Sequence, residues 1–272
     1  MAGKRLSVKA KKVGIAILNL SILLFLFLPL VFVLAMAFDP RRYVAWFPPV
    51  GFTLHWFDVF LHDSDFEIGL RSSIIISTAV TVASLLIAIP CAFALARHDF
   101  RGKEFLNTLI LSPIIIPGIV TGTALLVLFY SYLHIYAAMP GLIVGQTILG
   151  IPYVVRTVTA SMVGFDRSLE EAAKNLGADE MQTITKVTIP IIKPGIVAGA
   201  IFAFSTSWAD LSVAAFLTDT NTFTFPVAMM NYMRYNFDNT LAAASLFLVI
   251  VTALIVLVTE KTVGLDKFIG LW

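Results

Sequence analysis

The chain has 272 residues, of which 58% are hydrophobic and 13% are charged. Soluble globular domains carry about 25% charged residues, so the composition argues against a water-soluble enzyme. The formal net charge of +2 gives no indication of a nucleic-acid partner. The charges are also unevenly spread, because six apolar runs hold 142 residues and a single charge, Asp210.

Each apolar run is long enough to cross a bilayer, which takes about 20 residues. Prolines inside or at the ends of several runs predict kinked or broken helices. The sequence therefore predicts an all-α membrane protein with six transmembrane helices. In chain order the predicted spans cover residues 13–38, 72–96, 105–133, 137–155, 194–217 and 241–259.

The distribution of Lys and Arg predicts the orientation, because positive residues are retained on the cytoplasmic side. With the N-terminus inside, the inner segments hold fourteen Lys and Arg and the outer segments hold four, while Arg156 lies at the inner end of the fourth span. We therefore expect both termini in the cytoplasm. Residues 1–12 are predicted to be a basic cytoplasmic N-terminus, followed by a single transmembrane domain over residues 13–272.

Residues that could support metal binding or catalysis are sparse. Cys91 is the only cysteine, and the four histidines lack ligand spacing, so we expect neither a metal site nor a cofactor in this chain. Zinc-protease, nucleophile-elbow and phosphate-loop motifs are also missing from the sequence. An intramembrane enzyme is therefore a disfavoured alternative, and any ATP-driven activity requires an ATPase on another chain.

The inner segment 164–193 has a helical pattern rather than a loop pattern. Ser168 and Glu171 have the spacing of a capping box, and Gly177 can end the helix that follows. A second short helix is predicted from Asp179 until Pro190 interrupts it. We expect a helix, a glycine hinge and another helix in the cytoplasm, an arrangement that a simple channel would not need. The apolar positions of the first helix are Leu169, Ala172, Ala173 and Leu176.

The same segment carries a long spaced motif. Glu171-Ala172-Ala173, then Gly177, then Val187-Thr188-Ile189-Pro190 resemble the E-A-A motif of membrane subunits of bacterial ABC importers. Phe100-Arg101-Gly102-Lys103, Leu176-Gly177-Ala178 and Trp208-Ala209-Asp210 extend the resemblance, which is greatest to the second permease subunit of spermidine/putrescine-type transporters.

The resemblance implies the type I permease fold of ABC importers in the bacterial inner membrane. The implied activity is ATP-driven inward transport of a small solute, with a polyamine-like organic cation as the expected substrate and a phosphonate, an opine or iron as alternatives. The implied partners are a second permease subunit in a heterodimer, two ATPase subunits that carry ATP and magnesium, and a periplasmic binding protein. Residues 39–71 and 219–240 are candidate surfaces for that binding protein, and the second of these is predicted to contain a short amphipathic or re-entrant helix.

In that family the first helix of the motif is a coupling helix that docks in a groove of the ATPase. The resemblance assigns Glu171 as an acidic anchor to the ATPase, with a role only in the capping box as the alternative, and assigns Gly177 to setting the angle between the helices. The residues assigned to ATPase coupling are Ser168, Leu169, Glu171, Ala172, Ala173, Leu176 and Gly177.

Asp210 is a candidate substrate residue, because acids inside membrane spans are costly and usually functional. A continuous helix would place it on one stripe with small and polar residues, and Trp208 could attract a cation through its ring. The alternative is an ion pair with a partner subunit. The predicted pathway residues are Asp210, Trp208, Ser207, Thr206 and Ala203.

Overall fold

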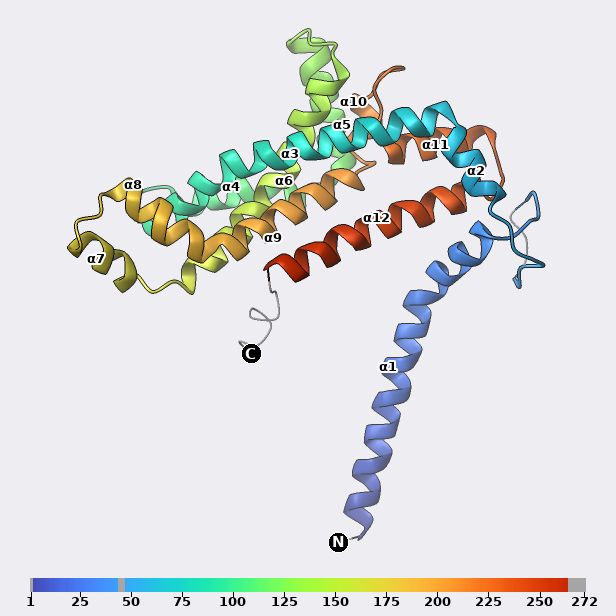
Figure 1. Ribbon diagram of the computed structural model, residues 1–272, viewed down its shortest axis with the longest axis horizontal. Helices are drawn as coiled ribbons and strands as arrows, with labels where there is room; N and C mark the ends of the chain where they lie inside the picture. The colour runs from blue at the N-terminus through green and yellow to red at the C-terminus, as the bar shows by residue number, and fades with distance from the viewer. Residues whose placement is uncertain (1, 44–46, 264–272) are drawn as a thin grey trace. The chain divides into compact units, whose positions relative to one another are not determined.

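The computed structural model describes residues 2–43 and 47–263, and every regular element in these residues is a helix (Figure 1). Contacts within the chain divide it into two units. The first comprises Met1–Asp63 and Tyr232–Val249, and the second comprises Ser64–Asn231 and Ile250–Trp272. The single transmembrane domain over residues 13–272 remains a prediction, and the expected cytoplasmic C-terminal end, residues 264–272, lies outside the described residues.

The first unit contains α1 (Ala2–Ala37), α2 (His55–His62) and the beginning of α12 (Thr240–Val263). The indole Nε1 of Trp56 donates to the carbonyl of Asp39 at 2.6 Å, and the amide of Asn239 donates to the same carbonyl at 3.3 Å. These bonds hold the chain leaving α1 against α2 and α12. The candidate docking segment 39–71 is therefore partly helical, and its residues 44–46 lie outside the described part of the chain.

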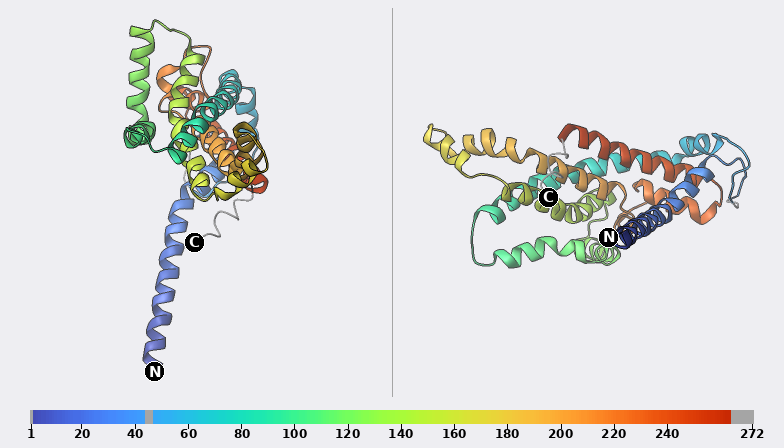
Figure 2. Two further views of the ribbon diagram at one scale, coloured as in Figure 1. Left: turned by 90° about the vertical axis from the view of Figure 1, so that its left-hand side faces the viewer. Right: turned by 90° about the horizontal axis from the view of Figure 1, so that it is seen from below.

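The second unit is built on three long helices, α3 (Ser64–Arg97), α6 (Ala138–Val163) and α9 (Ile189–Trp208), which run side by side (Figures 1 and 2). Gly195 and Gly199 bring α9 onto α6, because a Cβ at either position would lie 2.7 Å from an atom of Thr157. Small residues allow such close approach of helices in membranes. The buried core that they enclose is Ala88, Ala92, Leu95, Val154, Val155, Val158, Met162, Ile192 and Ala203.

The predicted span 105–133 is broken into two helices, α4 (Lys103–Ile115) and α5 (Gly118–Val127). A π-helical turn, η1 (Leu128–Tyr132), extends α5, and the two parts meet at an angle of 103° (Figure 2). Ile116 is extended at the break because Pro117 disfavours helical backbone in the residue before it. Five helices in the described residues are long and apolar enough to cross a membrane, or six if this bent pair forms one span.

The inner segment contains α7 (Ser168–Asn175), α8 (Glu180–Thr183) and the π-helical turn η2 (Ile184–Thr188). The expected interruption at Pro190 is wrong, because the helix continues from Glu180 to Trp208 over 29 residues. The backbone N–H of Ile189 donates to the carbonyl of Ile184, five residues earlier. We attribute the continuity to this wider turn, which precedes a proline that lacks an N–H and crowds a regular turn.

The predicted span 194–217 is also discontinuous. Helix α9 ends at Trp208, and a short helix, α10 (Ala214–Leu217), follows the break. The expected short helix within residues 219–240 is present as α11 (Phe225–Tyr235). In the second unit, the backbone N–H of Phe225 at its start donates to the hydroxyl of Ser73 in α3 at 2.8 Å.

Candidate coupling and translocation sites

Helix α7 exposes most of the residues assigned to ATPase coupling. Ser168, Leu169, Glu171 and Ala172 are exposed, and so are Leu176 and Gly177, whereas Ala173 is half-buried. Leu176 is 89% exposed and Leu169 is 48% exposed, so this segment presents two apolar side chains to its surroundings. The exposed surface of α7 is thus available for docking.

Gly177 ends α7 in the left-handed region, with φ of +90°. Its N–H donates to the carbonyl of Lys174 at 3.0 Å, and the N–H of Ala178 donates to the carbonyl of Ala173 at 3.0 Å. This pair of bonds is a Schellman motif, and the positive φ that it requires strains any residue that has a Cβ. The expected glycine cap is therefore confirmed.

The expected capping box is not formed. Ser168 is the first residue of α7 and Arg167 occupies the N-cap position. The backbone N–H of Ser168 donates to the carboxylate of Asp166 at 3.0 Å, and this bond lowers the pKa of Asp166. The side chain that caps this helix start is therefore Asp166, two residues before Ser168. Its Asx turn binds the backbone N–H of Ser168, which the side chain of Glu171 would have bound in the predicted capping box. Glu171 is then free of the capping role and remains exposed.

The buried acid of α7 is Glu170, which is 9% exposed. Its Oε1 accepts hydrogen bonds from the guanidinium of Arg97, the last residue of α3, and from the hydroxyl of Thr188 in η2. Arg97 Nη2 also lies 3.4 Å from the Thr188 hydroxyl. We call these three residues the Arg97–Glu170–Thr188 cluster.

Glu170 is charged in this cluster. Burial by itself raises the pKa of Glu170, but the hydrogen bonds from Thr188 and Arg97 and the nearby positive charges outweigh burial and lower it. A carboxylate with a lowered folded-state pKa adds stability above its unfolded-state pKa and loses it as the pH falls through the folded-state value. The cluster is consequently intact at neutral pH.

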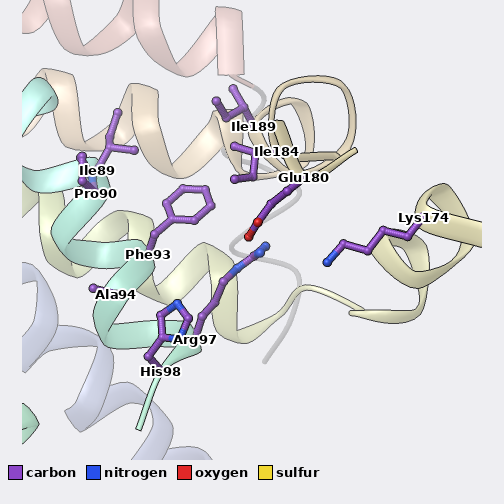
Figure 3. A pocket seen from close by; sticks show the side chains of 10 residues that line it. All are labelled: Ile89, Pro90, Phe93, Ala94, Arg97, His98, Lys174, Glu180, Ile184 and Ile189. Carbon is purple, nitrogen blue, oxygen red and sulfur yellow. The ribbon is translucent and has the colours of Figure 1, made fainter. Parts of the chain in front are cut away.

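A groove beside the cluster opens between the end of α3 and the α7–α9 segment (Figure 3). Its walls are apolar residues of α3 and of the start of the long helix, and Arg97, Lys174 and Glu180 direct their side chains into it (Figure 3). Arg97 also lies over the ring of Phe93, 5.1 Å from its centroid. Of the cluster, Arg97 lines this groove, whereas Thr188 is fully buried.

Asp210 lies in the break between α9 and α10, and not on a helical stripe as expected. Its Oδ2 accepts from the backbone N–H groups of Val213, directly before α10, at 3.2 Å and of Ala214, the first residue of α10, at 3.0 Å. The side-chain amide of Gln146 in α6 also donates to Oδ2 at 3.2 Å. The helix breaks here because the carboxylate provides an alternative partner for backbone groups.

A chain of polar side chains continues from Asp210 through the three long helices. The hydroxyl of Ser207 in α9 donates to Gln146 Oε1 at 2.5 Å and lies 3.1 Å from the hydroxyl of Ser77 in α3. Ser207, Gln146 and Ser77 are all buried. The structure thus brings together two of the predicted pathway residues, Asp210 and Ser207.

The other predicted pathway residues have different surroundings. Ala203 is buried in the helix core, and Thr206 is half-buried. Trp208 is 1% exposed and stacks with Phe204 and Phe225, at centroid distances of 6.1 and 6.5 Å. Its indole N–H has no partner among the described residues. Cation attraction by Trp208 would require this packing to open.

Four residues at these sites were not predicted from the sequence: Arg97, Glu170, Gln146 and Ser77. Two of them have a local signal, because Glu170 directly precedes the E-A-A motif and Arg97 is a positive residue at the end of an apolar run. Their pairing joins residues 73 positions apart. No local periodicity predicts such a contact.

Comparison with known proteins decides the family. Residues 84–261, more than half of the chain, match the family described as "Binding-protein-dependent transport system inner membrane component". The chain belongs to this family. It is therefore a multi-pass inner-membrane component of a binding-protein-dependent transporter, and not an enzyme, and the family gives it no cofactor of its own.

Two individual permease proteins are similar to this chain. The spermidine/putrescine transport system permease protein PotC of Escherichia coli (strain K12) is 27% identical over 90% of this chain and 92% of its own length. The molybdate/tungstate transport system permease protein WtpB of Pyrococcus abyssi is 34% identical over 53% of this chain and 58% of its own length.

A solved structure supports the predicted permease fold. A bacterial alginate ABC transporter, in complex with an alginate pentasaccharide-bound periplasmic protein, contains a chain that aligns with a TM-score of 0.70 and 17% identity. The alignment covers 94% of this chain and 95% of that one. The predicted all-α fold of an ABC importer permease is thereby confirmed.

Proposed function

We propose that this family member is the permease subunit of a bacterial importer for a polyamine-like organic cation. Its exposed helix α7 docks on a separate ATPase, and the polar chain around Asp210 contacts the solute. The observation that carries the proposal is the end-to-end match to the PotC permease, together with a carboxylate at the break after α9.

The docking role of α7 rests on its surface. The helix combines exposed apolar residues with the exposed acid Glu171 and ends rigidly at Gly177. A rigid helix transmits a displacement that a flexible loop would absorb. Leu169 and Leu176 provide the apolar contact with the ATPase, and Glu171 provides an ion pair at its edge.

The cation preference rests on Asp210. Its Oδ1 accepts a long bond of 3.3 Å from the N–H of Val213, so this oxygen retains capacity for an ammonium group. Oδ2 is held by Gln146 and the start of α10, which fixes the orientation of the carboxylate. A fixed carboxylate inside a membrane protein attracts a cation strongly, because the surroundings screen the charge poorly.

A second candidate substrate is a metal oxyanion, because WtpB is the more identical relative over the half of the chain that it matches. A carboxylate at the solute pathway would repel an oxyanion. Asp210 therefore favours the cation. The phosphonate alternative meets the same objection. Iron enters as a cation and an opine carries cationic nitrogen, so the charge of Asp210 does not argue against either of them.

The test is uptake by the reconstituted transporter. The chain is assembled in proteoliposomes with the second permease subunit, the ATPase and the binding protein encoded beside it, and uptake of labelled spermidine, putrescine and molybdate is compared. We expect ATP-dependent uptake of a polyamine only. Uptake of molybdate alone would overturn the proposed substrate.

Asp210→Asn is expected to lower polyamine uptake at least tenfold, because it removes the negative charge and keeps most of the shape. Ser212→Ala, at the next residue but one in the same break, is the matched control for disturbance of the turn. If the Asn variant transports polyamine at the wild-type rate, Asp210 has no part in recognition and the ion pair with a partner subunit becomes the better explanation.

A further inference from the structure

We propose that Arg97, Glu170 and Thr188 are positioning residues, which couple movement of α7 to movement of α3 and α9. This inference rests on the proposed docking of α7 to the ATPase. It adds to that function the side chains through which a displacement of α7 reaches the membrane-spanning helices.

The first step is the attachment of α7. Glu170 is the residue of α7 whose side chain is buried, while the neighbouring acid Glu171 is exposed. A helix of eight residues cannot bury enough apolar surface to fix its own orientation. The orientation of α7 is therefore set by the contacts of Glu170 and by the chain that follows Gly177.

The second step is the position of the two partners. Arg97 is the last residue of α3, and Thr188 is the last residue of η2, directly before α9. One carboxylate oxygen thus contacts the end of α3 and the turn that leads into α9. A movement of Glu170 must either displace these two partners or break at least one of the bonds.

The third step concerns the strength of these bonds. Hydrogen bonds between charged groups are about twice as strong as neutral ones, and partial burial reduces screening by water. A weaker bond from Arg167 Nη2 to the carbonyl of Ala96, at 3.4 Å, adds a second link from the α7 segment to the end of α3. Lys174, His98 and Glu180 face the same groove and do not replace either partner.

The experiment uses the complete transporter in proteoliposomes. Arg97→Gln and Glu170→Gln each remove one charge, the paired reversal Arg97→Glu with Glu170→Arg restores the ion pair, and Thr188→Val removes a hydroxyl while keeping the shape. Lys103→Gln is the matched control, because Lys103 forms an ion pair with the exposed Asp99 just beyond the end of α3, and no hydrogen bond or ion pair within the described residues joins Lys103 to Glu170 or Thr188. The readouts are ATPase retained on purification, ATP hydrolysis with and without loaded binding protein, and solute imported per ATP.

We expect the single charge removals to lower solute imported per ATP at least fivefold while hydrolysis continues, because the ATPase sites lie on another chain. Thr188→Val should cause a smaller loss in the same direction, and Lys103→Gln should cause none. The paired reversal should recover at least half of the loss. Thr188→Val, which is shaped like the native residue, keeps the test informative if a charge variant does not fold.

Two outcomes separate this inference from the proposed function. If the wild-type chain does not retain the ATPase, the docking of α7 is wrong. If the wild-type chain retains it and the variants import the wild-type amount of solute per ATP, the positioning role is wrong. A loss that the paired reversal does not recover overturns the role as well, since an effect of folding alone would behave in that way.

Discussion

At the scale of single residues, Gly177 has the strictest requirement. Its φ of +90° is open to glycine and costs other residues about 1–2 kcal/mol. No atom lies within 4 Å of the position that a Cβ would occupy, so the cost comes from the backbone and not from crowding. A side chain at this position therefore tests the angle between α7 and α8 directly.

Gly177→Ala should lower solute imported per ATP severalfold, because the strained cap loosens the end of α7, and should leave membrane insertion unchanged. Gly164→Ala is the matched control, since Gly164 also has no atom within 4 Å of its Cβ position and has an ordinary negative φ. Membrane-fraction immunoblots and coupled uptake assays measure the two effects. Equal coupling in both variants would show that the cap has no mechanical role.

The residue scale also shows what sequence can and cannot predict. Gly177 was predictable because a glycine after a helical pattern is a local signal for a left-handed cap. Glu170 and Glu171 are adjacent and chemically identical, yet one is buried and the other exposed. That difference depends on Arg97 and Thr188, which are brought together only by the packing of α3, α7 and η2.

At the scale of elements, hydropathy predicted the location of most membrane helices but not their breaks. The bend at Pro117 agrees with the expected effect of proline, whereas Pro190 lies in a continuous helix. The break at Asp210 has no proline or glycine and arises from a carboxylate that bonds backbone N–H groups. A hydropathy pattern cannot predict a break in which a side chain replaces the helical hydrogen bonds of the backbone.

The contact between α6 and α9 gives a prediction about stability. A Cβ on Gly195 would lie 2.7 Å from the backbone carbonyl of Thr157, so Gly195→Ala should destabilise the protein by about 1–3 kcal/mol. Gly14→Ala in α1 makes the same change in a helix with no atom within 4 Å and should be neutral or stabilising. Thermal unfolding of the detergent-purified complex, followed by size-exclusion chromatography, measures the difference. Equal melting temperatures would contradict the close packing of these helices.

At the scale of the whole molecule, one continuous helix connects the two candidate sites of the second unit. The helix from Glu180 to Trp208 has 29 residues and therefore a length of about 43 Å. Thr188 of the Arg97–Glu170–Thr188 cluster lies in the first third of this helix, and Ser207 and the break at Asp210 lie at its end. A displacement at α7 thus has a continuous helical path to the proposed solute residues.

The predicted orientation of the chain can be tested on the same scale. In a Cys91→Ala background, which removes the only cysteine, Ser168→Cys should be protected from a membrane-impermeant maleimide in spheroplasts, and Asn221→Cys should be labelled. The positive-inside distribution is the physical reason. Labelling of Ser168→Cys before permeabilisation would place α7 outside the cell and contradict both the orientation and the docking of α7.

The π-helical turn η2 also has an evolutionary consequence. A π turn holds one residue more than the α-helical turn it replaces, so the extra residue is accommodated without rotating the helices on either side. Losing one residue from Ile184–Thr188 would therefore keep α8 and α9 in the same orientation but place Pro190 after a regular turn, which its ring crowds. Homologues that are one residue shorter here should carry a residue other than proline at the position of Pro190, so the deletion and the loss of the proline should occur together.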